Sequence, residues 1–554
     1  MKHPCLSLAA CGLALALAAN ILILVASGAP LRQQGTPTTT DVDEVALMRR
    51  LRRGFLETGM RLAWRGWERH EDDSHPCSWW GVDCDAEQRI NKISIACRDD
   101  QGVAARAAQP LAGNATGPLP RELADLPRLE ELFIECSVLT RGSVPPGWGV
   151  PGAWPALKHL EIEASALQGQ LPDIQPGALR ALRHLRLTVQ GLRSTLPASW
   201  GGAGVLPALR TLQLYLDITG SLPSSWGAGF PRLEELVLSG RASWGSESMP
   251  PGEGDMGQPP GNPPASQPLP KEWTAPGSFP SLRILHLGGL GIAGSLPRAL
   301  VDGSLPHLTQ LSLPNNLLSS TLLPQLFANN TRLCKLWLGG NRFAGPLPLA
   351  WANSMAVQEV NLQGNALTGP AFPPAWLAPG AMPHLMLLHL GAKSALTGTL
   401  PARLPWPLSL LGVKGTAVHG SIPAAWCSLQ PLAGRLTHLW VSHSGVAPVL
   451  PACARESMPH LRLYPLPSGE DEPAEKAARL QHRQRWRAAA GVLVAAVPLV
   501  AFATIALWRQ QRRLGPARRS SLLLAPVLTA QHLTAASAGR PQGAQPGVCG
   551  CKRR

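Results

Sequence analysis

The chain has 554 residues, more than a single compact core usually accommodates. Its 55 Gly and 55 Pro stand beside only 2 Tyr and 8 Phe, yet most Gly and Pro recur at fixed places after a leucine, which indicates repeats and not low complexity. The formal net charge is +15, but residues 476–554 hold 14 Lys and Arg and no acidic residue, which leaves +1 on residues 1–475. The basic charge therefore indicates membrane topology and excludes nucleic acid as the favoured partner.

The N-terminal segment predicts export. A short basic start precedes an apolar run over residues 6–29 that ends in small residues. This predicts a signal peptide over residues 1–29, with an uncleaved signal anchor as the alternative. Farther on, Val45, Met48, Leu51 and Phe55 follow helical spacing and predict a short amphipathic helix.

A repeat occupies residues 88–463. It is clearest in residues 333–348, which fit the pattern LxxLxLxxNxLxGxLP. A stacked repeat of this length predicts an α/β solenoid, with leucines in the core and the residues between them on a shared parallel sheet. The first strand leucine of each repeat forms a column: Leu132, Leu160, Leu185, Leu212, Leu236, Leu285, Leu311, Leu336, Val360, Leu388, Leu411 and Leu439.

The step from Leu236 to Leu285 is too long by about one repeat of this class. It contains a Pro/Gly-rich insertion over residues 242–270, which we interpret as a mobile surface loop because it has few apolar anchors.

The repeat, together with the segment Cys77-Ser78-Trp79-Trp80-Gly81-Val82-Asp83-Cys84, resembles the plant-type leucine-rich-repeat receptor-like proteins. The resemblance implies a horseshoe with a parallel β-sheet on the concave face and turns or short 3-10 helices on the convex face. It implies an N-terminal cap over residues 30–87 with a disulfide between Cys77 and Cys84, and a C-terminal cap held by Cys427 and Cys453. In similar receptors an insertion sometimes helps to hold ligand, which is a second interpretation of residues 242–270.

Other cysteines and two glycosylation motifs have less definite roles. Cys97 and Cys136 follow two neighbouring strands and either bond or remain buried thiols, since geometry decides. Asn114 and Asn329 begin Asn-x-Thr motifs, which are glycan acceptors in an exported chain.

Tryptophans recur three residues after the repeat proline. Because aromatic residues at a packing period usually fill a core, we interpret them as structural and not as a row that stacks on sugars. These residues are Trp148, Trp200, Trp226, Trp273, Trp351, Trp376 and Trp426. Asn316, Asn341 and Asn365 hold the turn after the strand, and Asp217, Thr416 and Ser444 are among the residues that replace asparagine elsewhere.

The concave face is the expected ligand-binding surface. Early repeats carry acidic and then basic residues, and exposed Trp337 and Trp440 are candidate anchors, since aromatic side chains offer apolar area at low entropic cost. The strand-face histidines are expected to be solvated. The candidate ligand-binding residues are Phe133, Glu161, Glu163, Arg186, Tyr215, His286, Trp337, His389 and Trp440.

The C-terminal part predicts a membrane anchor. An acidic juxtamembrane linker over residues 464–487 precedes an apolar segment over residues 488–508, flanked by arginines and tryptophans, which predicts one transmembrane helix. The basic tail over residues 509–554 is too short for a kinase domain. It is expected to be cytoplasmic.

The sequence contains no supported catalytic triad, metal motif or nucleotide loop, so we expect neither an enzyme nor a cofactor or metal site. The resemblance implies a plasma-membrane protein that binds an extracellular peptide, protein or glycan and signals through a partner such as a co-receptor kinase. A membrane-tethered inhibitor of secreted hydrolases, like the polygalacturonase-inhibiting proteins, and an adhesion or wall-structural protein are the alternatives.

Overall fold

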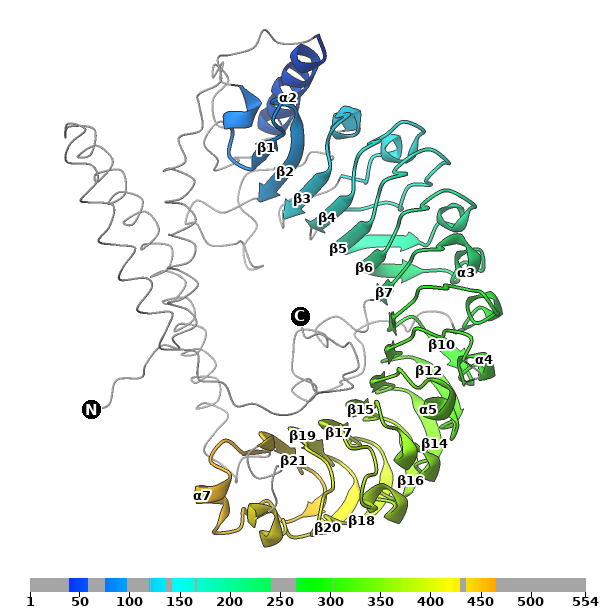
Figure 1. Cartoon of the computed structure of the whole chain (residues 1–554), viewed down its shortest axis with the longest axis vertical. Helices are drawn as coiled ribbons and strands as arrows, with labels where there is room; N and C mark the ends of the chain where they lie inside the picture. Colours follow the sequence, from blue (N-terminus) through cyan, green and yellow to red (C-terminus); the bar gives the residue numbers. More distant parts are fainter. Residues whose placement is uncertain are drawn as a thin grey trace, which may run out of the picture. The chain divides into compact units, whose positions relative to one another are not determined.

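A computed structural model describes residues 39–57, 75–96, 119, 121–135, 142–164, 167–240, 266–301, 303–428 and 435–464. The described repeats form a solenoid whose strands line the inner side of an arc and whose short helices lie on its outer side (Figure 1). The α/β leucine-rich-repeat solenoid expected from the sequence is therefore confirmed.

The concave sheet has fifteen strands among the described residues, and each strand from β2 onward pairs in parallel with the next. Only β1 runs antiparallel to its neighbour β2. The strands are β1 (Val82–Cys84), β2 (Ile90–Ala96), β3 (Glu131–Glu135), β4 (His159–Ala164), β5 (His184–Thr195), β6 (Thr211–Thr219), β7 (Glu235–Ser239), β9 (Ile284–Gly288), β11 (Gln310–Ser312), β13 (Lys335–Trp337), β15 (Glu359–Asn361), β17 (Leu387–His389), β19 (Leu410–Gly412), β21 (His438–Trp440) and β23 (Arg462–Tyr464).

The predicted leucine column is in register across the sheet. Leu132 pairs with Leu160, and the column continues through Leu439 to Leu463. Leu236 on β7 pairs directly with Leu285 on β9. The long step between these two leucines therefore adds no strand to the concave sheet.

A second, eight-stranded sheet follows the concave one in the later repeats and was not predicted. From β10 onward, each of its strands contains one buried apolar residue, which is Leu, Ile, Phe or Val. They are β8 (Gln267–Pro268), β10 (Ile292–Gly294), β12 (Leu317–Thr321), β14 (Arg342–Gly345), β16 (Ala366–Pro370), β18 (Ala395–Thr399), β20 (Ala417–Gly420) and β22 (Gly445–Val446).

Strands β5 and β6 are longer than the others because they run straight on past the concave sheet. Asp217 therefore lies within β6, between the buried Leu216 and Ile218, and faces outward. The expectation that Asp217 replaces the turn asparagine was wrong, because this repeat has no turn at that point.

Short helices lie on the convex side, and several of them carry the repeat tryptophans. They are η2 (Arg121–Asp125), η3 (Pro146–Gly149), η4 (Ala198–Gly201), α3 (Trp226–Gly229), η6 (Lys271–Trp273), α4 (Arg298–Val301), α5 (Leu326–Asn329), η7 (Leu349–Asn353), η8 (Pro374–Leu377), η9 (Ala424–Ser428) and α7 (Ala454–Ser457). All seven predicted tryptophans are buried, which confirms the structural interpretation.

The tryptophans also link one repeat to the previous one. Trp200 Nε1 donates to Pro172 O at 2.9 Å, and Trp226 Nε1 donates to Pro197 O at 3.0 Å. The rings of Trp200 and Trp226 stack with centroids 6.1 Å apart. These indoles thus fill the core and donate to a backbone carbonyl of the neighbouring repeat, which a leucine would leave unpaired. Trp148 is the exception, because its Nε1 is buried without a hydrogen-bond partner among the described residues.

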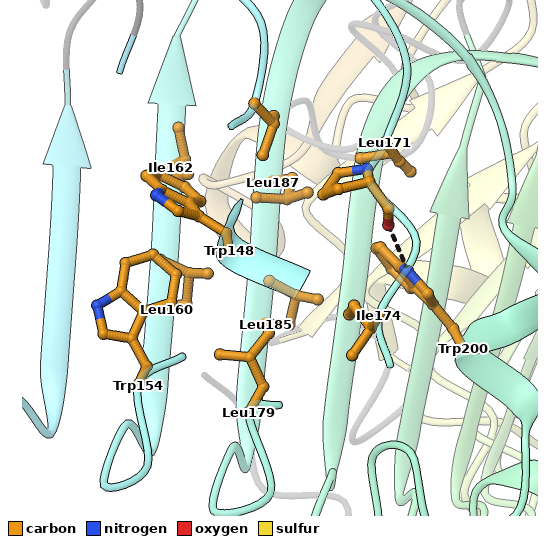
Figure 2. Close-up of a pocket in the computed structure, with 12 residues that line it drawn as sticks. Trp148, Trp154, Leu160, Ile162, Leu171, Ile174, Leu179, Leu185, Leu187 and Trp200 are labelled. Atoms are coloured by element: carbon orange, nitrogen blue, oxygen red, sulfur yellow. Dashed lines mark hydrogen bonds between the residues drawn. The ribbon is translucent and has the colours of Figure 1, made fainter. Parts of the chain in front are cut away.

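One repeat breaks this ladder and leaves a cavity. It carries Ile174 near the place where its neighbours carry Trp148 and Trp200, and a cavity of about 30 Å³ lies among these side chains. Figure 2 shows Ile174 beside Trp200, with Trp148 across the cavity. The cavity follows from a smaller side chain at a position shaped for an indole.

Asparagines hold the turns as expected, and they reach across repeats. Asn341 Nδ2 donates to Leu313 O of the previous repeat at 2.8 Å and to Leu338 O of its own at 3.0 Å. Thr416 Oγ1, by contrast, donates at 2.7 Å to Val413 O in its own repeat. The hydroxyl substitutes therefore satisfy the local turn without the link between repeats.

The N-terminal cap consists of helix α2 (Thr39–Glu57), η1 (Pro76–Ser78) and β1. The predicted helix is present, and its buried side includes Met48 and Leu51 as expected. Two charged residues are also buried: the Glu44 carboxylate accepts from Ile90 N at 3.2 Å, and the Arg52 guanidinium lies 4.8 Å from the Trp79 ring centroid. The predicted disulfides Cys77–Cys84 and Cys427–Cys453 are both formed.

Several predictions concern residues outside the described ranges: the segment 1–29, most of the insertion, Cys97, Cys136, Asn114, the linker beyond Tyr464, the span 488–508 and the tail. Within the described ranges, α2 is the longest helix, and no helix there is long and apolar enough to span a bilayer. The predictions for residues outside the described ranges are therefore not tested by the structure and remain expectations.

Candidate functional site on the concave sheet

The candidate binding residues lie on the concave face in the predicted order. Phe133, Glu161 and Arg186 are register partners on β3, β4 and β5. Glu163 and Tyr215 belong to a parallel row two residues farther along the strands, joined through Thr188. Side chains alternate between the two faces of a strand, so all five lie on the face opposite the buried leucines.

Five neighbouring side chains on β3 to β6 form what we call the concave patch: Phe133, His159, Glu161, Arg186 and Tyr215. The rings of Phe133 and His159 are 4.7 Å apart, and His159 Nε2 lies 3.7 Å from Glu161 Oε2. Arg186 Nε lies 3.5 Å from Glu161 Oε1, and the Arg186 guanidinium carbon is 5.6 Å from the Tyr215 ring centroid. The patch is therefore one connected set of aromatic and charged groups across four strands.

The patch is open to solvent. The Arg186 side chain is 45% exposed, and the Glu161 side chain is 31% exposed. Ion pairs this exposed add little to folding stability, so the arrangement is not required to hold the sheet together. Arg186 meets Glu161 through Nε, and no other acidic side chain among the described residues forms an ion pair with it, which leaves the end of its planar fork for a carboxylate or amide oxygen.

The middle of the sheet differs from the prediction. His286, expected to be solvated, is only 4% exposed, and its Nδ1 lies 2.8 Å from Ser312 Oγ. Trp337 is half-buried with Lys335 Nζ 5.9 Å from its ring centroid, and its indole nitrogen is buried without a hydrogen-bond partner among the described residues. Part of the Trp337 ring is therefore exposed to solvent, as expected, whereas its indole nitrogen is buried.

The C-terminal candidates are buried as well. His389 is 1% exposed and Trp440 is 3% exposed, so the expectations of a solvated histidine and an exposed tryptophan were wrong. Their rings meet edge to face at 5.0 Å. Burial beside Lys414 lowers the pKa of His389 to about 3, desolvation being the larger cause. The imidazole is therefore neutral at any physiological pH.

Four side chains on the concave face are absent from the candidate ligand-binding residues predicted from the sequence: His159, Leu387, Leu410 and Tyr464. The first three precede the strand leucine by one residue, and alternation puts that position on the concave face together with the residue after the leucine. The predicted binding residues come from the row after the leucine and from the row two residues farther along. The row before the leucine contains these three residues.

Among the described residues, no group of three or more His, Cys, Asp or Glu side chains is placed to hold a metal ion. The functional potential of the described surface lies in recognition, through shape, aromatic contacts and charge.

The long parallel sheet with short helices on its convex side is a leucine-rich-repeat fold. Among solved structures, the chain is similar to the ectodomain of the Arabidopsis receptor kinase HAESA bound to an extended IDA peptide hormone, with a TM-score of 0.53 and 21% identity over 74% of this chain. It is similar also to HAESA in complex with IDA and the co-receptor SERK1, with a TM-score of 0.50 and 22% identity over 73% of this chain.

This likeness concerns the fold. The chain matches 62% of the length of each HAESA structure. No protein-family model matches the chain, and no curated protein sequence matches it.

Proposed function

We propose that the chain is a cell-surface recognition protein that binds an extracellular peptide, protein or glycan on its concave face and signals through a membrane partner. The observation that carries the proposal is the concave patch, because it joins partly exposed aromatic rings to an ion pair that contributes little to stability. The peptide-bound HAESA structures, which have a similar fold, support an extracellular peptide ligand and a co-receptor as the partner.

The patch favours a ligand with both apolar and charged groups. Phe133 and Tyr215 offer aromatic area at the two ends, while Glu161 and Arg186 offer one charge of each sign between them. Such a surface suits a peptide segment, because a peptide backbone and side chains present complementary groups a few ångströms apart.

The test uses the intact protein in detergent, incubated with extracellular fluid and analysed for bound molecules by mass spectrometry. Arg186→Ala and Phe133→Ala are expected to reduce the captured ligand at least about tenfold, as loss of an interface anchor does. Arg298→Ala, which removes an exposed arginine from α4 on the convex side, is the control and is expected to have no effect. Equal capture by all variants would contradict the proposal.

The hydrolase-inhibitor alternative predicts inhibition of secreted wall hydrolases by the intact protein without any partner. The adhesion alternative predicts that removal of residues 509–554 leaves function intact. A receptor that depends on a partner is expected to lose signalling in that truncation while it keeps ligand binding. The two measurements separate the three functions.

A further inference from the structure

A row of charged side chains lies directly before strands β3 to β7, outside the concave patch. The backbone ladder of the sheet includes this row: Arg183 N donates to Lys158 O at 2.8 Å, and Arg210 N donates to Arg183 O at 2.8 Å. Bonds of the same kind add one residue at each end. We call the five residues the edge row, in the order Glu130, Lys158, Arg183, Arg210 and Glu234. All five are exposed or half-buried.

The two ends of the edge row form ion pairs, and its centre does not. Lys158 Nζ lies 2.6 Å from Glu130 Oε1, and Arg210 Nη1 lies 2.6 Å from Glu234 Oε1. Arg183 is exposed between these two paired cations, and no acidic side chain among the described residues forms an ion pair with it. Like charges side by side on neighbouring strands are destabilising. The stability of the sheet therefore does not explain an arginine at this place.

The order of charges along the edge row limits what fits there. Three cations occupy two strand spacings, a length of about 10 Å, and one carboxylate follows at each end. The planar guanidinium of Arg183 is suited to hold a ligand carboxylate through two parallel hydrogen bonds. A long, uniformly anionic polymer would meet Glu130 or Glu234 on either side, and like charges placed together disfavour binding. A short acidic cluster with basic groups on either side has the complementary order.

We propose that the edge row binds a short acidic cluster of a peptide ligand, with one ligand carboxylate held by Arg183. The inference rests on the proposed ligand-binding role of the concave face and names the chemistry of a second contact. Arg183 precedes Arg186 of the concave patch by three residues, which is about 10 Å along a strand. One peptide can therefore reach both the edge row and the concave patch.

The experiment titrates the full chain in detergent with two acetylated and amidated peptides, Lys-Glu-Glu-Glu-Lys and Lys-Gln-Gln-Gln-Lys, by isothermal calorimetry. The acidic peptide is expected to bind at least about tenfold more tightly, as a hydrogen bond to a charged group provides. Arg183→Gln is expected to weaken binding of the acidic peptide by a similar factor and to leave the glutamine peptide unchanged.

Arg342→Gln, at an exposed position on β14, is the matched control. It changes the net charge of the chain as Arg183→Gln does, so any nonspecific attraction of the acidic peptide falls equally in both variants. The affinity of Arg342→Gln is expected to equal that of the wild type. Because both arginines are exposed, both variants are expected to keep the wild-type unfolding midpoint.

A uronic-acid oligosaccharide tests the order of charges. It is expected to bind the wild-type chain more weakly than the acidic peptide, and to gain affinity when Glu130→Gln and Glu234→Gln are combined. The inference is overturned if the two peptides bind equally or not at all, or if Arg183→Gln keeps the wild-type affinity. Tighter binding of the oligosaccharide than of the acidic peptide to the wild-type chain would also overturn it, because the edge row would then favour a polysaccharide.

The outcome is separable from that of the proposed function. If the acidic peptide binds through Arg183 while Phe133→Ala and Arg186→Ala do not change capture of extracellular ligand, the edge row stands as a binding site and the concave-patch proposal falls. If capture depends on Phe133 and Arg186 while Arg183→Gln changes nothing, the edge-row inference falls alone.

Discussion

His389 combines features that rarely occur together on the face of a sheet. It is buried, it lies over a glycine, its Nδ1 is unpaired among the described residues, and the charge of Lys414 acts on it. The burial and the neighbouring charge both disfavour protonation. The residue is therefore a neutral polar group in the folded chain.

The lowered pKa makes stability depend on pH. His389 titrates near 6.5 in the unfolded chain and at about 3 in the folded chain. Between these values the unfolded chain binds more protons, so this site stabilises the fold fully above pH 6.5 and loses that contribution as pH falls, by up to about 1.4 kcal/mol per pH unit.

Thermal unfolding from pH 7.5 to 4.5 measures the effect. The midpoint of His389→Phe is expected to fall less with pH than that of the wild type, whereas His384→Phe, at an exposed histidine, keeps the wild-type dependence. Parallel curves for wild type and His389→Phe would show that His389 does not remain neutral in the fold.

The cavity beside Ile174 predicts a stabilising substitution. Ile174→Phe places more apolar volume where the neighbouring repeats have tryptophan and is expected to stabilise the chain by about 0.5–1 kcal/mol. The same change at Ile134, which is buried and lines no part of this cavity, is expected to destabilise it by about 1–3 kcal/mol through overpacking. Calorimetry of both variants checks the prediction, and equal losses would argue against a usable cavity.

At the scale of elements, the adjacency of β7 and β9 predicts that the insertion is dispensable for the fold. Leu236 and Leu285 pair directly, so replacing residues 243–264 with a short Gly/Ser linker keeps the register. The free energy of unfolding is expected to change by less than about 0.5 kcal/mol, which is the usual size for substitutions away from packed contacts. A loss of several kcal/mol would show that the insertion packs on the repeats.

Strand positions followed from the sequence because the strand leucines recur once per repeat, and each leucine pairs with the next as predicted. The exposure of individual side chains could not be predicted from the sequence in the same way. Trp440 packs with Leu387, two strands away, and with Tyr464 on the next strand, while the His389 ring lies over the glycine at position 412. The sequence pattern of one row of side chains does not show how those side chains contact the neighbouring rows.

At the scale of the whole molecule, Asn329 tests the predicted export of the repeats. Its side chain is exposed at the end of α5, whereas the next residue, Asn330, is buried and donates to Leu300 O at 2.7 Å. A glycan on Asn329 is therefore compatible with the fold. Glycosidase treatment of the chain from cells is expected to increase its gel mobility, and Asn329→Gln is expected to reduce that shift. An unmodified Asn329 peptide in the mature protein would count against export.

Site-directed photo-crosslinking tests the proposed binding face. A benzoylphenylalanine replaces Tyr215 in the concave patch or Leu349 on the convex side of the intact protein in cells, and cross-linked extracellular molecules are identified after irradiation. The concave position is expected to capture a specific ligand that Arg186→Ala releases, while the convex position captures none. Capture from the convex position alone, or capture at both positions that Arg186→Ala leaves unchanged, would contradict recognition on the concave sheet.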